Sequence, residues 1–528
     1  MWRLEHTLWS FVFTQNQGAK INVKNLGIRG ASHTYEALLV SLRGLICIWD
    51  EMPDAEVGLE WALNYLAGVT TPYGKLEAHS QGVGYANGKS TWMIDAVCAV
   101  RTALPRVEIE KLPHLDGLSE FVNFITPIGL DHSSGGNRAF DETDWTMRRY
   151  NNNILLGYLT GNGNAIANAE ATASRLEERG LEAAIYSPWV AITAAGHMNR
   201  PEPSLETKTE RVWPLAGIVA VATEGPSDYK KWKNNVGMIF YSRPAGGYDH
   251  SFRMDNSFDI FAYGQVLAHG GGGTNNGDKF GHASMSHNTV LINGRGQTHS
   301  QSRAPYSARL VAYEDHSDFK YFAGDATNAY ASSTGLQRFV RHVLFMRGAY
   351  FIIYDDLSAK EPAKYQWLYH LHPNAEEFNI LPGHGFDLKV NGVRMQVQHV
   401  TNASNPEIEN RQGDMGRRNP FTREDYRRAR RRRKFRKRNA AVRDSSRYAH
   451  HIWVNTARQA LDHHFLTILY PYKDGENPCI INTIGDKAVN VTMPDGTQDI
   501  VAFGEPVPSA TMIVKIDEMR ENSIFDAT

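Results

Sequence analysis

The stretch HVLFMRGAYFIIYDDL, residues 342–357, decides the fold class of the C-terminal half of this 528-residue sequence. Two runs rich in β-branched and aromatic residues, 343–346 and 350–354, lie on either side of Arg347-Gly348-Ala349. This pattern predicts a β-hairpin with a tight turn at the glycine. Similar short runs occur at 237–241, 289–292 and 309–313. Strands at such short spacing favour an antiparallel β-sandwich over alternating strands and helices.

The N-terminal part has a helical periodicity instead. Its apolar residues recur with the 3.6-residue period of a helix at 38–46, 91–102, 145–159, 165–179 and 182–196. Medium helices joined by short loops favour antiparallel helical hairpins. We therefore predict an α+β multidomain protein, with helical hairpins first and a β-sandwich after Pro201-Glu202-Pro203.

The composition excludes several protein classes. With 42% hydrophobic residues, 21% charged residues and a net charge of −1, bulk disorder is excluded. No apolar run approaches the roughly 20 residues of a membrane-spanning helix. Three cysteines without a CxxC pair cannot form a disulfide framework. Because residues 1–6 do not open a signal peptide, the chain is either cytoplasmic or lacks its natural beginning, and the sequence leaves the localisation open.

One segment carries a strong local charge. Between Arg417 and Arg438 there are thirteen Arg and Lys residues against Glu424 and Asp425, a local net charge of +11, so the rest of the chain carries −12. We interpret it as a solvated, mobile insertion, with attraction to a polyanion as the alternative. The predicted organisation is an α domain at 1–205, a β-sandwich at 206–400, a basic insertion at 401–445 and a C-terminal β region at 446–528.

Four polar stretches hold the candidate functional residues: 25–38, 77–85, 246–258 and 269–289. His33 lies at the start of a predicted helix, and Tyr85 lies in a predicted glycine-rich loop. Five histidines fall between His250 and His299, which suggests a metal. None of them has HxH or HExxH spacing, however, so structural histidines beside one catalytic histidine are the preferred interpretation.

These stretches form four motifs in a fixed order. They are Ser32-His33, then Gln81-Gly82-Val83-Gly84-Tyr85, then Asp249-His250-Ser251 with Asn256-Ser257-Phe258, and finally Ser286-His287-Asn288-Thr289-Val290 with Gly296-Gln297. In this order they resemble the Asn-His, "EGxxY", "HSHxDxNSF" and "HNTVxxDGxGQ" elements of the heparinase II/III-like polysaccharide lyases. That family includes oligoalginate lyases and heparin lyases. The mutual consistency of the four motifs is stronger than any one of them.

The resemblance implies an N-terminal α/α toroid, incomplete in this chain, followed by an antiparallel β-sandwich. It also implies β-elimination beside a uronic acid and a periplasmic or secreted location. The implied catalytic residues are His33, Tyr85 and His250, and the expected substrate-binding residues are Asn25, Arg29, Gln81, Asn256 and Gln297.

The resemblance bears on cofactors and partners as well. No cofactor is required, and a structural zinc ion stays open, with His287 as the best candidate ligand. Phe252 and Gly270 stand where many members have zinc ligands, which leaves the usual ligand set incomplete. The expected partner is an acidic polysaccharide such as alginate, a glycosaminoglycan or ulvan. The sequence decides neither the particular uronate, nor endo or exo action, nor the oligomeric state.

Three alternatives remain open. A toroid glycoside hydrolase needs two carboxylates flanking the bond, but Asp141, Glu142 and Asp144 are too close in sequence for that and suit a helix start instead. A non-catalytic protein that binds acidic polysaccharides would keep the cleft without the chemistry. A nucleic-acid-binding protein built on the arginine run ranks behind these two, and it predicts that deleting 412–443 abolishes function, whereas a lyase would show altered affinity or salt dependence.

Overall fold

The structure is a computed structural model with two compact units, a helical unit within residues 1–208 and a β unit that takes up most of residues 209–528. The residues that it describes are 42–52, 55–60, 62–63, 66, 83–104, 113–126, 143–178, 180–183, 199–228, 230–243, 253–269, 283–298, 308–372, 375–400, 406–414, 448–504 and 512–514. No helix in these ranges is both long and apolar enough to cross a membrane.

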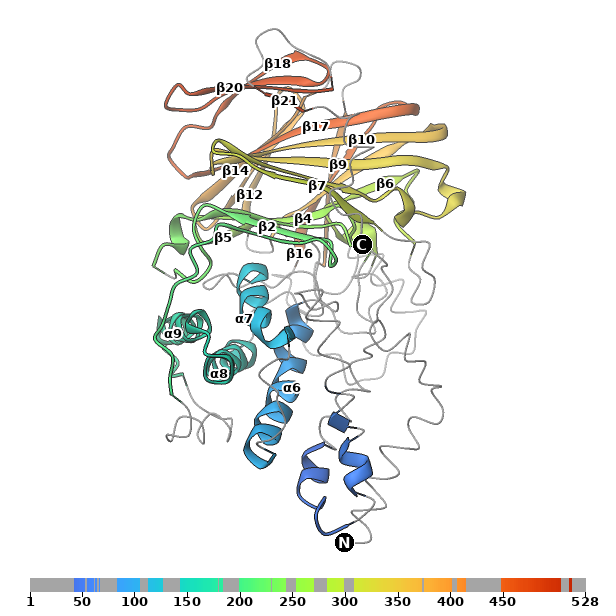
Figure 1. Ribbon diagram of the computed structural model, residues 1–528. Helices are drawn as coiled ribbons and strands as arrows, with labels where there is room; N and C mark the ends of the chain where they lie inside the picture. The colour runs from blue at the N-terminus through green and yellow to red at the C-terminus, as the bar shows by residue number, and fades with distance from the viewer. Residues whose placement is uncertain are drawn as a thin grey trace. The chain divides into compact units, whose positions relative to one another are not determined.

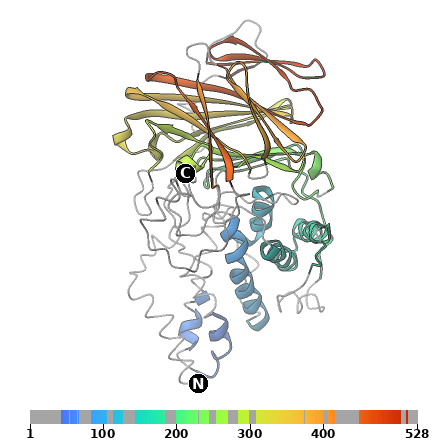
Figure 2. The ribbon, with the colours of Figure 1, turned by 180° about the vertical axis from the view of Figure 1, so that it is seen from behind.

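The described part of the helical unit contains four long helices. They are α6 (Val83–Ala103), α7 (Pro113–Ile125), α8 (Thr143–Thr160) and α9 (Gly163–Glu178). Helices α8 and α9 lie side by side (Figure 2), because Gly161 leaves α8 with a positive φ of 71° and the Asn162 side chain caps the N–H of Asn164 at 2.9 Å. Both end signals are local, so the sequence alone specifies this turn.

Buried polar side chains join the helices to one another. The hydroxyl of Ser119 on α7 donates to Asn153 Oδ1 on α8 at 2.8 Å and accepts from Asn168 Nδ2 on α9 at 3.0 Å. Thr91 on α6 donates to Asn152 on α8 at 3.0 Å. These bonds fix the relative registers of the helices, since an unmade buried hydrogen bond is costly.

The described strands of the β unit form four sheets. Their strands are β1 (Glu210–Trp213), β2 (Ile218–Ala222), β3 (Val236–Tyr241), β4 (Ser257–Ala262), β5 (Gln265–Ala268), β6 (Val290–Ile292), β7 (Arg309–Asp315), β8 (Phe319–Asp325), β9 (Leu336–Met346), β10 (Tyr350–Ala363), β11 (Tyr365–His370), β12 (Ala375–Leu381), β13 (Gly385–Val390), β14 (Val393–Val400), β15 (Glu407–Asp414), β16 (Tyr448–Asn455), β17 (Ala460–Lys473), β18 (Ile480–Gly485), β19 (Ala488–Thr492), β20 (Gln498–Phe503) and β21 (Met512–Val514). The largest sheet has the order β12-β13-β14-β17-β10-β9-β8-β7 and is antiparallel throughout (Figure 1). The others have the orders β1-β2-β3-β4-β5, β15-β16-β11-β6 and β18-β19-β20-β21.

The hairpin predicted at 342–357 forms the middle of the largest sheet. Strands β9 and β10 pair from Met346 opposite Tyr350, and the turn uses positive φ at Arg347 (50°) and Gly348 (66°), as a type I′ turn requires. Across the pair, the rings of Phe345 and Phe351 stack at 4.7 Å between centroids.

Both faces of this sheet are buried, which explains why the hairpin sequence is apolar almost without alternation. Val343 and Ile353 belong to a core shared with the five-stranded sheet and with β6, β11 and β16. Leu344 and Ile352 belong to a second core on the opposite face, shared with β18–β20. The fold-class prediction, a helical region followed by antiparallel β-sheets, is confirmed.

The structure also refines several sequence predictions. The helical patterns at 91–102, 145–159 and 165–179 lie in α6, α8 and α9, and α7 is an additional helix. Residues 407–414, which the sequence places in the basic insertion, form β15 and pair with β16 on the far side of the basic segment. The core of that segment, 415–447, lies outside the described residues. The predicted domain boundaries otherwise stay a prediction.

Candidate functional site

Two motif segments that are separate in sequence meet in the β unit. One is 255–258 at the start of β4, and the other is 287–290, between the short 3-10 helix η4 (Ser284–Ser286) and β6. The backbone N–H of Asn288 donates to Ser257 Oγ at 3.0 Å, and its side-chain amide donates to the Phe258 carbonyl at 2.7 Å. The Thr289 hydroxyl donates to the Asp255 carbonyl at 2.9 Å. The two motifs therefore form one hydrogen-bonded cluster, which we call the motif cluster.

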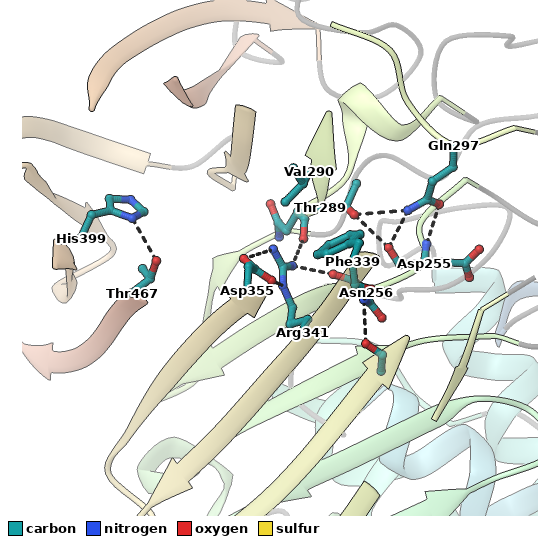
Figure 3. Close-up of polar contacts among 12 residues, drawn as sticks. Asp255, Asn256, Thr289, Val290, Gln297, Phe339, Arg341, Asp355, His399 and Thr467 are labelled. Atoms are coloured by element: carbon teal, nitrogen blue, oxygen red, sulfur yellow. Dashed lines mark hydrogen bonds and ion pairs between the residues drawn. The ribbon is translucent and has the colours of Figure 1, made fainter. Parts of the chain in front are cut away.

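Gln297 completes the motif cluster from a third segment (Figure 3). Its Oε1 accepts from the N–H of Asp255 at 2.9 Å, and its Nε2 donates to the Asp255 carbonyl at 2.7 Å. Its own backbone N–H donates to Ser284 Oγ at 2.8 Å. The side-chain amide thus pairs with Asp255 as a neighbouring strand would, and only 3% of Gln297 is exposed.

Asn256 occupies a special backbone position in the same cluster. Its φ is 54°, a left-handed conformation that asparagine tolerates better than most residues. Its side-chain amide donates to the carbonyl of Gly324 at 2.9 Å, and the residue is fully buried. A Cβ at Gly324 would lie 2.4 Å from Asn256 Oδ1, so β8 needs glycine there. Sugar contacts by Asn256 and Gln297 stay a prediction. In the structure both side chains support the backbone.

A buried ion pair lies at the centre of the motif cluster (Figure 3). Arg341 on β9 and Asp355 on β10 are cross-strand partners, and both are fully buried. Arg341 Nε and Nη2 donate to the two carboxylate oxygens at 2.6 and 2.8 Å. Arg341 Nη1 donates to the carbonyl of Asn288 at 2.7 Å and also to that of Asn256. One guanidinium therefore binds both motif segments and the central hairpin.

Sequence reasoning missed this pair, although a signal was present. Phe339, Val343 and Phe345 alternate along β9 and point into one core, and Arg341 falls in the same alternation. A charge at such a position requires a partner. The hairpin register fixed by the turn places Asp355 opposite. Both residues were therefore recognisable from the 342–357 stretch once it was extended by one residue.

The ends of the segment that carries His250 are tied together. The backbone N–H of Arg243 donates to Asp255 Oδ1 at 3.2 Å, and residues 244–252 run between these two positions. Burial raises the pKa of Asp255 to about 6, against the opposing effect of the Arg243 charge. His250 itself lies outside the described residues.

His287 lies between η4 and Asn288 and is fully buried. Its backbone N–H donates to the Ser284 carbonyl at 3.0 Å. A second histidine, His370, contacts Asn288, the residue after His287. The His370 ring lies with Nδ1 3.0 Å from Asn288 Oδ1 and Nε2 3.0 Å from the Met285 carbonyl. Burial lowers the pKa of His370 well below its ordinary value, and the nearby His451 adds to this effect.

The zinc ion that the resemblance leaves open stays a prediction. In the part of the chain that the structure describes, no three His, Cys, Asp or Glu side chains gather closely enough to hold a metal ion. Phe252 and Gly270, which lie outside that part, have no side-chain atom that binds zinc.

The remaining predicted site residues lie in or before α6. The loop prediction for Tyr85 is wrong, because α6 begins at Val83 and places Tyr85 in its first turn. Gly82 and Gly84 suggested a loop, but the helix that the sequence predicts from residue 91 begins eight residues earlier, at Val83. The side chain of Tyr85 lies outside the described part of the chain. So do all of the other four residues: Asn25, Arg29, His33 and Gln81.

Comparison with known proteins assigns the family. A family model described as Heparinase II/III-like, C-terminal matches residues 234–523, which is more than half of the chain and includes the whole motif cluster. The chain belongs to this family. No curated protein sequence matches it.

Solved structures of heparinase-type lyases share the fold of this family member. A mutant of the heparan sulfate lyase HepC from Pedobacter heparinus matches with a TM-score of 0.61 at 14% identity, over 93% of this chain and 69% of that one. A structure of heparinase III matches with a TM-score of 0.61 at 12% identity, over 88% of this chain and 66% of that one. At these identities the likeness concerns the fold.

Proposed function

We propose that this heparinase II/III-like protein is a polysaccharide lyase. It would cleave a uronic-acid-containing polysaccharide or oligosaccharide by β-elimination and leave an unsaturated uronate end. The observation that carries the proposal is the family match, within which segments 255–258 and 287–290 are joined into one cluster. The similarity to a heparan sulfate lyase supports an acidic polysaccharide as the substrate class.

The chemistry requires three functions. The C6 carboxylate must be neutralised so that charge can develop on it when the C5 proton leaves. A base must take the C5 proton, and an acid must protonate the departing O4. We assign proton transfer to Tyr85, and the base, carboxylate-partner and orienting roles to His33 and His250. Asn25 and Arg29 are the proposed grip on the carboxylate, with Gln81 as a further substrate contact.

The residue types suit these roles. Histidine, with an ordinary pKa of about 6.5, exchanges protons near neutral pH. Tyrosine, with an ordinary pKa of about 10, needs a cation beside it to act as a base, and a histidinium or arginine supplies one. The motif cluster contributes by fixing Asp255, five residues after His250, to the framework of the β unit.

The test is to incubate the protein with alginate, heparan sulfate, chondroitin and ulvan and to follow absorbance at about 235 nm, where the unsaturated uronate product of elimination absorbs. We expect a rise with at least one polymer, which Tyr85→Phe and His250→Ala abolish. Matched controls are Tyr158→Phe on α8 and His316→Ala on the surface of the β unit, and both should retain activity.

Other outcomes would replace the proposal. Reducing ends that accumulate without absorbance would indicate a hydrolase. Binding of the polymer without either product would indicate a non-catalytic binding protein. Activity that survives both Tyr85→Phe and His250→Ala would refute the assigned residues while keeping the reaction.

The basic segment within 417–438 suits the same substrate class. Its charge of +11 would attract an anionic chain, and counterion release would make that attraction dependent on salt. Deleting 417–438, which leaves β15 and β16 in place, should therefore raise KM at low salt and leave kcat unchanged. A loss of kcat would show that the segment does more than gather substrate.

A further inference from the structure

The Arg341–Asp355 pair differs from the other ion pairs of the β unit in what it binds. The Arg347–Asp499 pair, for example, joins a partly exposed arginine (37% exposed) to a buried carboxylate that also accepts from the Tyr350 hydroxyl. Arg341 is fully buried and donates to backbone carbonyls in two separate motif segments. It therefore connects loops, whereas Arg347 connects a turn to a strand.

The guanidinium is suited to this connection in a way that lysine is not. Its planar fork binds both oxygens of Asp355 while Nη1 reaches the carbonyls of Asn256 and Asn288. Its Cζ also lies 5.4 Å from the ring centre of Phe258 and 5.6 Å from that of Phe339. A lysine ammonium offers neither the fork nor the flat face.

Burial makes the connection cooperative. If either motif segment moved away, the guanidinium would lose a charge-assisted hydrogen bond with no water to replace it. Each segment is therefore stabilised by the other through one shared cation. Opening one should loosen both.

The pair also stands in the middle of the largest sheet. Strands β9 and β10 are neighbours in the middle of the eight-stranded sheet, and β10 is paired on its other side with β17 over most of its length. A site held by side chains on such strands keeps its geometry better than one held by loops.

From these observations we infer that Arg341 and Asp355 are positioning residues. They fix the segments around Asn256 and Asn288, and through Asp255 the end of the segment that carries His250. The inference deepens the proposed function and rests on it for activity, but not for the link between the segments.

Hydrogen exchange tests the link without any substrate. In the unaltered full-length protein, amides in 253–262 and 283–292 should open together, with the same dependence on low concentrations of urea. Treatment with a chelator should leave their exchange unchanged. Independent opening of the two segments would overturn the inference, and so would loosening by the chelator.

Two variants and a matched control extend the test. Arg341→Lys keeps the charge and Asp355→Asn keeps the shape, and each should accelerate exchange in both segments at once. Asp499→Asn removes the charge of a comparably buried carboxylate elsewhere in the β unit and should leave both segments protected. If exchange in both segments were equally faster in all three variants, the pair would contribute only to overall stability, and the inference would be refuted.

Activity then separates positioning from stability. On the polymer that the lyase assay identifies, Asp355→Asn should lower kcat by at least about tenfold with little change in KM, because a small misplacement is costly in the transition state. Asp499→Asn should keep kcat at temperatures where it is folded. If the exchange results hold but no polymer is cleaved, the lyase proposal fails and the link stands. If Asp355→Asn keeps full kcat, the positioning role fails.

Discussion

Buried histidines should make the β unit sensitive to acid, and His399 permits a direct test. It lies on β14 with its ring buried, and Nδ1 is 2.9 Å from the hydroxyl of Thr467 on the neighbouring strand β17 (Figure 3). Burial lowers the pKa of His399 to about 3, and His384 adds a smaller effect. An unfolded histidine titrates near 6.5, so the unfolded state binds more protons below that pH. Stability therefore falls as the pH drops from about 6.5 towards 3.

The size of the effect follows from the cited pKa values. A histidine held neutral in the fold loses about 1.4 kcal/mol of unfolding free energy per pH unit, or about 2 kcal/mol between pH 8 and pH 5. Burial also lowers the pKa of His370, which acts in the same direction. Asp255 acts in the opposite direction, because its pKa is raised from 3.8 to about 6 and its protonation stabilises the fold by about 1.4 kcal/mol over the same interval. The loss from the histidines therefore exceeds the gain from Asp255, so acid destabilises the fold.

The assay is urea unfolding followed by the circular dichroism of the β-sheet at pH 8, 7, 6 and 5. His399→Asn places an amide oxygen near the position of Nδ1 and cannot be protonated in this range. It should cost stability at pH 8 but reduce the further loss between pH 8 and pH 5 by about 2 kcal/mol. His316→Asn, at an exposed position, is the control and should follow the wild type. Parallel pH curves for His399→Asn and the wild type would refute the reasoning that burial keeps His399 neutral.

Other substitutions test the core and the motif cluster. Phe322→Ala removes a fully buried ring from the larger core and should cost about 3 to 5 kcal/mol in urea unfolding, whereas a cost below about 1 kcal/mol would contradict that packing. Gly324→Ala forces the Asn256 side chain away, so the melting temperature and the lyase rate should fall together. A variant with wild-type melting temperature would show that Asn256 moves freely. Gln297→Met keeps the length of the side chain but leaves the N–H and carbonyl of Asp255 without this partner, and we expect a loss of at least about 2 kcal/mol. A neutral effect in the same urea assay would mean that water replaces the amide.

The sequence was most informative where structure is local. The hairpin at 342–357 was predicted with its turn, because glycine and two apolar runs specify it without help from the rest of the chain. Helix α7 was not predicted, since Pro113 at its start and Gly117 inside it read as turn signals. Proline is tolerated in the first turn of a helix, and packing outweighs the cost of one glycine.

The motif cluster was predicted in part. The resemblance selected segments 255–258 and 287–290, and the structure brings them together. It could not tell that Gln297 and Asn256 face backbone groups, because the orientation of these side chains depends on which strands become neighbours across sheets. Tertiary pairing of that kind leaves no trace in local periodicity.

The order in which the largest sheet is completed has a consequence during synthesis. On β10, Phe351 pairs with Phe345 on one side and with Leu469 on the other, and Leu469 is added more than a hundred residues later. At roughly 5 to 20 residues per second, the nascent hairpin waits about 6 to 24 s for β17 with one apolar edge unpaired. An open strand edge of this kind invites pairing with other chains. Expression yield should therefore depend on translation speed and on chaperones that shield the emerging hairpin.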